Sequence, residues 1–338
     1  MVKMKRLLNI PIWVVEVITT AKSFQGNPII GSPVLNKMGL HVFRLLVSHA
    51  VMRARMLLLS PLISAEDRKS YFSKGYIVKE DFLTDEEFQS LENAARTFDG
   101  EIREARQGNT LTHRAVLSPE VLEGRQVLED VIDNRNLNKL TQFTSGHLRK
   151  PLYYLEEVKN QYCSGAEDPQ KTFHNDTFHP SMKCWLFIDD VTPETGPFTF
   201  VPESHKLSWK RIKWQYRMSL EASNDKNGYH AKGSTRYLEG DLKELGLPEP
   251  KPFTVKKNTL VIVNVFGIHR RGNSKKSTRL ALWGDSRTNP FIPFPGIGGK
   301  FANQIQYYFL GLYRKKMDDA AAARGHRSAW HIIETDEK

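Results

Sequence analysis

The chain has 338 residues, of which 40% are hydrophobic and 26% are charged, so it has the composition of a globular protein and not of a disordered one. Its formal net charge of +11 favours an anionic partner, such as a phosphorylated substrate, an anionic membrane surface or nucleic acid. The two cysteines, Cys163 and Cys184, are too few for a disulfide framework or a thiolate zinc site, and they fit a reducing cytoplasm.

Residues 1–65 are predicted to form a basic, amphipathic helical region, because residues 17–65 contain no Asp or Glu. Residues 39–64 predict one helix whose polar residues recur at helical spacing, namely His41, Arg44, Ser48 and Arg55. Two arrangements fit this pattern. The apolar face packs on the rest of the protein, or it enters an anionic membrane with the arginines among the headgroups. A transmembrane span is disfavoured by the arginines, and no secretory signal is predicted.

Residues 66–150 lead into the next region through a strand and a helix. The alternation in residues 75–82 predicts the strand, and Thr84 with Glu87 predicts a capping box at the start of the helix. His113 and Arg114 follow in a polar stretch and are candidates for a substrate entrance. A solvated loop is the favoured interpretation of that stretch.

A candidate metal motif begins at His174. In a strand, residues two apart point to the same face, so the side chains of His174 and Asp176 would lie together. An imidazole and a carboxylate are two of the three ligands of a facial triad for non-haem Fe(II). His269, at the end of a strand-like run, is the predicted third ligand, and His205 is its main rival.

Arg279 begins another strand-like run and is able to clamp a carboxylate through two parallel hydrogen bonds. Residues 206–250 predict a polar excursion in which basic residues alternate with aromatic ones. Such a surface suits a phosphorylated or lipid headgroup, or an exposed insertion. No fold signature for DNA or RNA binding is present, so nucleic acid is an unlikely partner.

The order of these motifs resembles the phytanoyl-CoA dioxygenase family, over roughly residues 71–289. The similarity is strongest at residues 174–176, 196–205 and 269–279. One departure is Glu203, which stands where the family usually has Gly in a Pro-Gly-Ser-His turn.

The resemblance implies a mainly β protein with flanking helices around a double-stranded β-helix, a jelly-roll or cupin-like core. It implies that Fe(II) is bound by His174, Asp176 and His269, with 2-oxoglutarate and O2 filling the other positions. Arg279 would hold the distal carboxylate of 2-oxoglutarate, and Trp185 would form a wall of the same pocket. Because halogenating relatives replace the carboxylate ligand, Asp176 implies a hydroxylase.

The expected substrate is anionic and membrane-linked, because the charge and the helix at residues 39–64 favour it. With its positive charge and its amphipathic helix, the chain is similar to the family members that hydroxylate the Kdo sugar of lipopolysaccharide at the inner leaflet. Two alternatives stay open: a soluble hydroxylase of a small metabolite or acyl-CoA, and a non-catalytic barrel that binds lipid or nucleic acid. An intact triad with Arg279 disfavours the second alternative.

The predicted organisation has three parts. Residues 1–65 form the basic helical region, residues 66–289 the oxygenase domain, and residues 290–338 a C-terminal helical extension. The expected location is cytoplasmic, with peripheral association at the inner face of the membrane.

Overall fold

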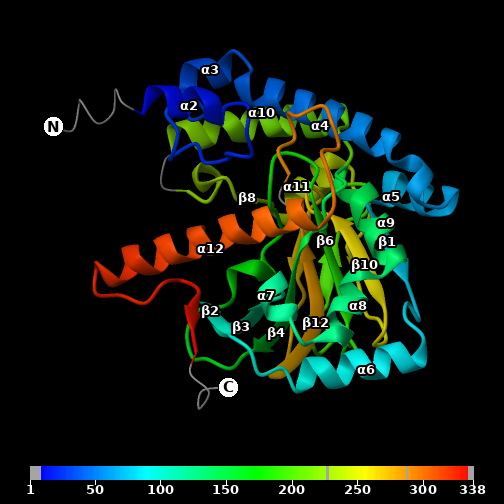
Figure 1. Cartoon of the computed structure of the whole chain (residues 1–338). Helices are drawn as coiled ribbons and strands as arrows, with labels where there is room; N and C mark the ends of the chain where they lie inside the picture. The colour runs from blue at the N-terminus through cyan, green and yellow to red at the C-terminus, as the bar shows by residue number, and fades with distance from the viewer. Residues whose placement is uncertain (1–8, 226–227, 287, 334–338) are drawn as a thin grey trace.

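The computed structural model describes residues 9–225, 228–286 and 288–333 (Figure 1). The larger sheet contains β1 (Tyr76–Lys79), β2 (Arg103–Gln107), β3 (Thr110–Val116), β4 (Leu152–Asn160), β6 (Met182–Phe187), β10 (Leu260–Asn264), β12 (Ser277–Asp285) and β13 (His331–Ile332). The smaller sheet contains β5 (His174–Asn175), β7 (Phe198–Phe200), β8 (Thr235–Arg236), β9 (Lys251–Pro252) and β11 (His269–Arg271). The helices are α2 (Ile10–Glu16), α3 (Pro33–Lys37), α4 (Leu40–Leu58), α5 (Ala65–Lys74), α6 (Asp85–Arg96), α7 (Pro119–Leu122), α8 (Gln126–Asp133), α9 (Arg135–Ser145), α10 (Trp209–Asn224), α11 (Glu239–Leu245) and α12 (Lys300–Ala322).

Both sheets are antiparallel in the part of the chain that the structure describes. Their strand orders are β1-β10-β6-β12-β4-β3-β2-β13 and β8-β5-β11-β7-β9. These two sheets confirm the predicted double-stranded β-helix core. The flanking helices are extensive, so the protein is a mixed α/β structure.

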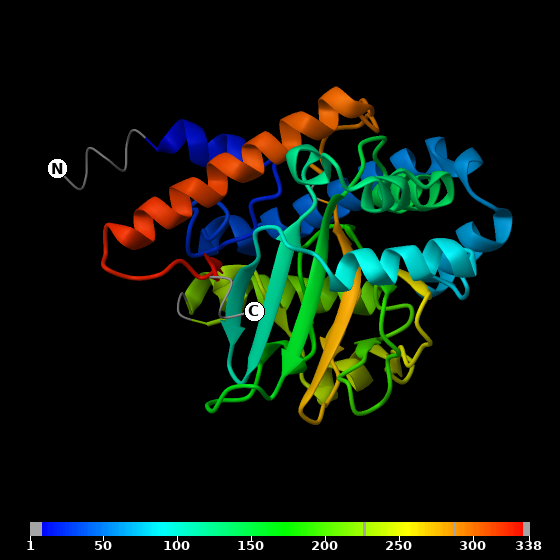
Figure 2. The ribbon, with the colours of Figure 1, turned by 60° about the horizontal axis from the view of Figure 1, so that its bottom comes forward.

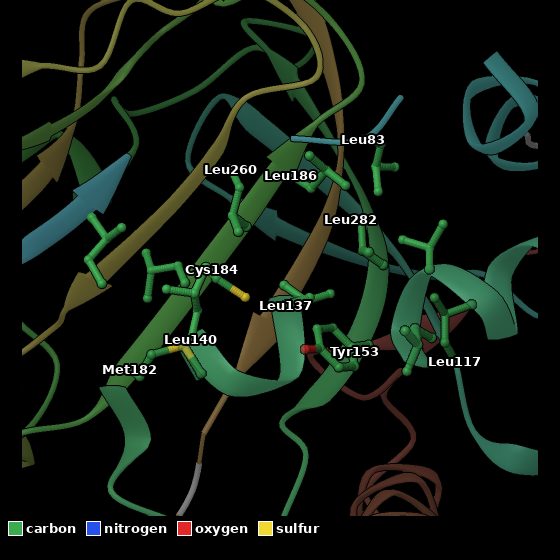
Figure 3. Packing of buried hydrophobic residues seen from close by; sticks show 14 of the residues in the cluster. Leu83, Leu117, Leu137, Leu140, Tyr153, Met182, Cys184, Leu186, Leu260 and Leu282 are labelled. Atoms are coloured by element: carbon green, nitrogen blue, oxygen red, sulfur yellow. The ribbon is translucent and has the colours of Figure 1, made fainter. Parts of the chain in front are cut away.

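Side chains of the larger sheet alternate between two environments. In β12, Ala281 and Trp283 face the space between the sheets, whereas Leu282 faces a cluster that includes residues of α6, α8 and α9. Figure 3 shows Leu137 and Leu140 of α9 against the sheet residues of that cluster. Because both faces of β10 are covered, its five residues are all buried, which explains its continuous apolar sequence.

The predicted capping box is confirmed at the start of α6. The Thr84 side chain accepts from the backbone N–H of Glu87, and the Glu87 side chain accepts from the backbone N–H of Thr84. The box fixes the helix that covers the outer face of the larger sheet, as Figure 2 shows from below.

Helix α4 packs on the protein with a side that mixes polar and apolar residues. His41, Arg44, Ser48 and Arg55 are all buried. Arg44 Nη2 donates to the carbonyl of Ala21 at 2.6 Å, and Arg55 Nε donates to the carbonyl of Gly146 at 2.5 Å. Leu45, Met52 and Met56 are buried on the same side, so α4 packs part of its apolar surface on the protein, as one of the two alternatives expected. Backbone carbonyls of neighbouring loops receive the arginines, and Phe43, Leu46 and Leu57 remain exposed on the outward side.

Helix α10 corrects the interpretation of residues 206–250 as a polar excursion. Arg211 and Trp214 of this helix are buried, and the Trp214 indole donates to Asp241 at 2.9 Å. α10 packs against α3 and α4, so part of its basic and aromatic character serves the interior of the protein.

The C-terminal segment folds back on the larger sheet. α12 leads into β13, which pairs with β2 at the sheet edge. Residues 1–8 and 334–338 of the two predicted terminal regions lie outside the described ranges. Among the described helices, none is long and apolar enough to cross a membrane.

Candidate active site

The two strands β5 and β11 bring the three predicted metal ligands together. His269 is the direct antiparallel partner of His174, and their ring centroids are 4.5 Å apart. Asp176 follows β5, with its carboxylate 3.8 Å from His174 Nε2 and 3.6 Å from His269 Nε2. One ligand atom from each of the three residues lies within 4.8 Å of the others.

Backbone carbonyls orient both imidazole rings. His174 Nδ1 lies 2.8 Å from the carbonyl oxygen of Thr172, and His269 Nδ1 lies 2.8 Å from that of Gly267. Because a carbonyl oxygen only accepts, Nδ1 of each ring carries the proton and Nε2 keeps a free lone pair. Carbonyl-anchored histidines with one free nitrogen are typical of metal centres.

The electrostatics of the site keep His174 and Asp176 in the protonation states that a metal requires. Burial, with a contribution from His269, lowers the pKa of His174 to about 3, so this ring is neutral at pH 7. Burial by itself would raise the pKa of Asp176, but Lys183 and His269 hold it well below its usual range. Lys183 Nζ lies 2.6 Å from Asp176 Oδ2.

The donor set fits Fe(II). Two imidazole nitrogens and one carboxylate oxygen, close together and aimed at a common space, are the donors of a facial triad. Among the described residues, no other group of His, Cys, Asp and Glu side chains meets the same criterion. His205, the rival third ligand, lies elsewhere, with Nε2 3.2 Å from the carbonyl of Phe72.

The triad lies in a cavity of about 260 Å³ between the two sheets. The cavity is lined by Gln107, Thr112, Arg114, Glu156, Gln170, His174, Asp176, Lys183, Trp185, Phe198, His269, Arg270, Arg271, Arg279, Trp283 and Trp330. Five of these residues are Arg or Lys, whereas two are acidic, so the cavity carries an excess of positive charge.

Arg279 lies in the wall of this cavity, as a carboxylate clamp requires. Its side chain is buried, and Nη1 donates to the carbonyl of Gly196 at 2.7 Å. Burial, with Arg271 nearby, lowers the pKa of Arg279 to about 10, which leaves the guanidinium protonated at pH 7. The remaining guanidinium donors are available to a ligand carboxylate.

Trp185 also lies in the cavity wall. Its ring is buried and packs on Phe198 at a centroid distance of 4.8 Å, and Phe198 in turn lies 5.2 Å from the His269 ring. Trp185 therefore contacts the metal site through one intervening aromatic ring. Its predicted role as a wall of the cosubstrate pocket stays a prediction.

Arg114 was predicted to lie in a solvated loop, but it belongs to β3 and lines the cavity. Its guanidinium lies over the rings of Trp283, at 3.9 Å, and Trp330, at 4.6 Å, and it donates to Glu156 at 2.7 Å. His113 points to the other face of β3, where it pairs with Glu104 at 2.8 Å. The strand alternation that separates these two residues is present in the sequence, but the polar composition of the stretch obscures it.

Several contacts in the site were not predicted. Lys183, whose orientation the sequence left open, turns toward Asp176, whereas the neighbouring His179 is buried with Nδ1 2.9 Å from the carbonyl of Pro180. Trp330 reaches the cavity from the C-terminal segment, and no sequence pattern predicted this contact.

Glu203 adopts the backbone conformation that the family motif demands. Its φ is +67°, in the left-handed region that favours glycine. The turn thus keeps its geometry without glycine. The neighbouring Ser204 hydroxyl accepts from the backbone N–H of Ile268 at 2.7 Å, which links the turn to the residue before His269.

Comparison with known proteins supports the same assignment. A family model described as phytanoyl-CoA dioxygenase (PhyH) matches residues 71–241. Similar solved structures include HygX from Streptomyces hygroscopicus with nickel and 2-oxoglutarate bound, at 16% identity, 66% coverage of this chain, 87% of that chain and a TM-score of 0.43. EctD from S. alaskensis with bound Fe is 18% identical over 71% of this chain and 82% of that chain, with a TM-score of 0.41. No curated protein matches the chain significantly.

Proposed function

This chain belongs to the phytanoyl-CoA dioxygenase family of Fe(II)- and 2-oxoglutarate-dependent oxygenases, and we propose that it hydroxylates a C–H bond of an anionic, membrane-linked substrate. In the overall reaction, O2 places one oxygen atom in the substrate hydroxyl and the other in succinate, and 2-oxoglutarate loses CO2. The Kdo sugar of lipopolysaccharide is our candidate substrate, since it is a lipid-linked sugar acid.

The observation that carries the proposal is the juxtaposition of His174, Asp176 and His269 with the buried Arg279 in one cavity. Bound Fe(II), with 2-oxoglutarate and O2, supplies the oxidising chemistry. The two histidines present their Nε2 atoms and Asp176 its carboxylate. Arg279 would hold the distal carboxylate of 2-oxoglutarate.

The aromatic residues of the cavity would limit the access of water to the reacting atoms. Trp185, Phe198 and Trp283 line it beside the triad, and all three are buried. Apolar walls limit the access of water to the reacting atoms. They also leave the charged residues as the main polar groups that a substrate meets.

The charge of the cavity supports an anionic substrate. Arg114 pairs with Glu156, and Arg271 pairs with Asp168 at 2.5 Å. Arg270 lines the cavity as a further cation beside Arg279. Arginines in fixed orientations recognise carboxylate or phosphate groups. The carboxylate of a sugar acid and the phosphates of an acyl-CoA both meet this requirement, so a soluble acyl-CoA is the second candidate.

The test compares candidate substrates in vesicles and in solution. The purified enzyme with Fe(II), 2-oxoglutarate and ascorbate receives Kdo2-lipid A, lipid A without Kdo, or phytanoyl-CoA, and mass spectrometry follows succinate and the oxygenated product. The proposal predicts a product with one added oxygen atom from Kdo2-lipid A alone, and none with His174→Ala. A product from phytanoyl-CoA alone would identify the second candidate and overturn the lipid-linked substrate.

A further inference from the structure

We propose that an apolar surface built by α2, the outward side of α4, the loop of residues 290–299 and α12 docks this protein on an anionic lipid bilayer. We call it the docking surface. The inference rests on the proposed function in one respect: docking would bring the active site to a lipid-linked substrate. Its evidence lies outside the catalytic cavity.

The orientation of α4 is the first observation. A helix that packs on a protein normally buries its apolar residues and exposes its polar ones, but the buried side of α4 carries four polar residues beside Leu45, Met52 and Met56. Phe43, Leu46 and Leu57 point outward, and Phe43 is 64% exposed. Backbone carbonyls accept hydrogen bonds from both buried arginines, which holds this side of α4 on the protein and leaves Phe43, Leu46 and Leu57 exposed on the other side.

α2, α12 and the loop of residues 290–299 also expose apolar residues. No residue of α2 is buried, although six of its seven residues are apolar. In α12, Ala302 is the single buried residue of the helix. The loop that precedes α12 carries Phe294 and Ile297, which are 70% and 75% exposed, and Phe301 at the start of α12 is 71% exposed. Exposed apolar residues gathered on adjoining elements mark an interaction site.

Hydrogen bonds join these elements. Arg55 of α4 donates to the carbonyl of Asn289, and the Asn289 side chain donates to the carbonyl of Ile18, just after α2. α12 follows the same loop directly. Figure 2 shows α2, the loop and α12 along the upper edge of the molecule, with α12 in front, and Figure 1 shows α4 behind the loop.

The charge around the docking surface selects an anionic bilayer as the occupant. Residues 17–65 and 290–317 contain no Asp or Glu, although the chain has 38 acidic residues; Glu16 at the end of α2 and Asp318 and Asp319 near the end of α12 are the acidic residues of these elements. Exposed basic residues lie within the same segments, namely Lys37, Arg53, Lys300, Lys315 and Lys316. A second copy of the chain would bring like charges together, whereas anionic headgroups would neutralise them while the acyl boundary receives the apolar side chains.

The surface is suited to lie on the membrane, since no described helix can span one. It is also tied to the active site. Lys22, between α2 and α3, donates to the backbone carbonyl of Asp176 at 2.6 Å, and Trp330 beyond α12 lines the cavity. The segments that follow α2 and α12 therefore contact a proposed metal ligand and the cavity, respectively.

The experiment measures cosedimentation of the full chain with vesicles. One set of vesicles is phosphatidylcholine and the other contains phosphatidylglycerol. We expect binding to the anionic vesicles that weakens in high salt. The triple variant Phe294→Ser, Ile297→Ser and Phe301→Ser should lower the partition coefficient by at least about tenfold, because three apolar side chains lose their burial.

The control is Leu238→Ser, which removes an apolar side chain that is 74% exposed outside the docking surface, and it should bind vesicles as the wild type does. His174→Ala should also bind normally, so vesicle binding and oxygenase activity can fail separately. Equal binding of the triple variant and the wild type would overturn the proposal. A stable dimer that the triple variant disrupts, without vesicle binding, would assign the surface to a second copy instead.

Discussion

His269 and His174 are direct cross-strand partners, one from β11 and one from β5, with their rings 4.5 Å apart. The register of the smaller sheet thus sets the distance between the two nitrogen ligands. A one-residue slip of either strand would turn one imidazole to the opposite face and abolish the site.

A divalent metal should stabilise the protein, because it binds the assembled triad and not the unfolded chain. We expect Co(II), as a redox-stable substitute for Fe(II), to raise the melting temperature of the wild type by several degrees. His269→Ala should keep its fold and lose most of this shift. His326→Ala, at an exposed histidine outside the site, is the control and should keep the shift; an unchanged shift in His269→Ala would contradict the assignment.

Arg114 should contribute to substrate recognition without contributing to metal or 2-oxoglutarate binding. Its guanidinium lies against Trp283 and Trp330 in the cavity wall. Arg114 also neutralises the buried Glu156 of the same wall, so we expect Arg114→Gln, which leaves that carboxylate uncompensated, to raise the KM for an anionic substrate by about tenfold or more. The KM for 2-oxoglutarate should change little. A larger effect on 2-oxoglutarate than on the substrate would place the cosubstrate at Arg114.

Glu203 pays a conformational cost at φ +67°. Replacing it with Gly should raise the free energy of unfolding by about 0.5–1 kcal/mol, because the strain of a left-handed L-residue exceeds the added entropy of glycine. Urea unfolding measures the difference. Glu80→Gly, at an exposed position without a positive φ, is the control and should not stabilise; a destabilised Glu203→Gly would show that the Glu203 side chain matters more than its backbone.

Buried neutral histidines make the fold sensitive to acid. Burial lowers the pKa of His41 and His179 to about 4 and that of His174 to about 3. Between these values and the unfolded value of about 6.5, the unfolded chain binds more protons than the folded one. Stability is therefore complete above about pH 6.5 and is lost as the pH falls, by about 1.4 kcal/mol per pH unit for each such histidine.

Urea unfolding between pH 7.5 and 5 measures that slope. His41→Gln should reduce it, whereas His326→Gln, at an exposed position, should leave it unchanged. A free energy of unfolding that is constant across this range would contradict the burial of neutral histidines.

The central part of the fold could be predicted because its signals are local. The capping box of Thr84 and Glu87 and the buried run of β10 depend on short-range spacing, and the motif order resembles a known family over the matched region. The orientation of α4 could not be predicted in this way. Amphipathic spacing identifies two faces, but only the carbonyls of Ala21 and Gly146, brought close by tertiary structure, explain why Arg44 and Arg55 are buried beside the apolar residues.

The active site also combines residues that short-range spacing predicts with residues that only tertiary structure brings together. His174 and Asp176 are two residues apart, so strand periodicity alone predicts that they lie together. The prediction that His269 joins them depended on the order of motifs in the family. Trp330 reaches the cavity through the path of the C-terminal segment. Lys183 is a separate case, because its contact with Asp176 depends on which way one strand residue faces. Long-range contacts of this kind leave no short-range pattern in the sequence.

The most direct test of the central claim is an anaerobic titration of Fe(II) and 2-oxoglutarate into the purified protein, followed by visible absorption. The account predicts a weak charge-transfer band that requires both additions. The band should be lost in His174→Ala and His269→Ala, and Arg279→Ala should need much more 2-oxoglutarate to reach it. Absence of the band in the wild type at saturating Fe(II) and 2-oxoglutarate would contradict the assignment of this cavity as the oxygenase active site.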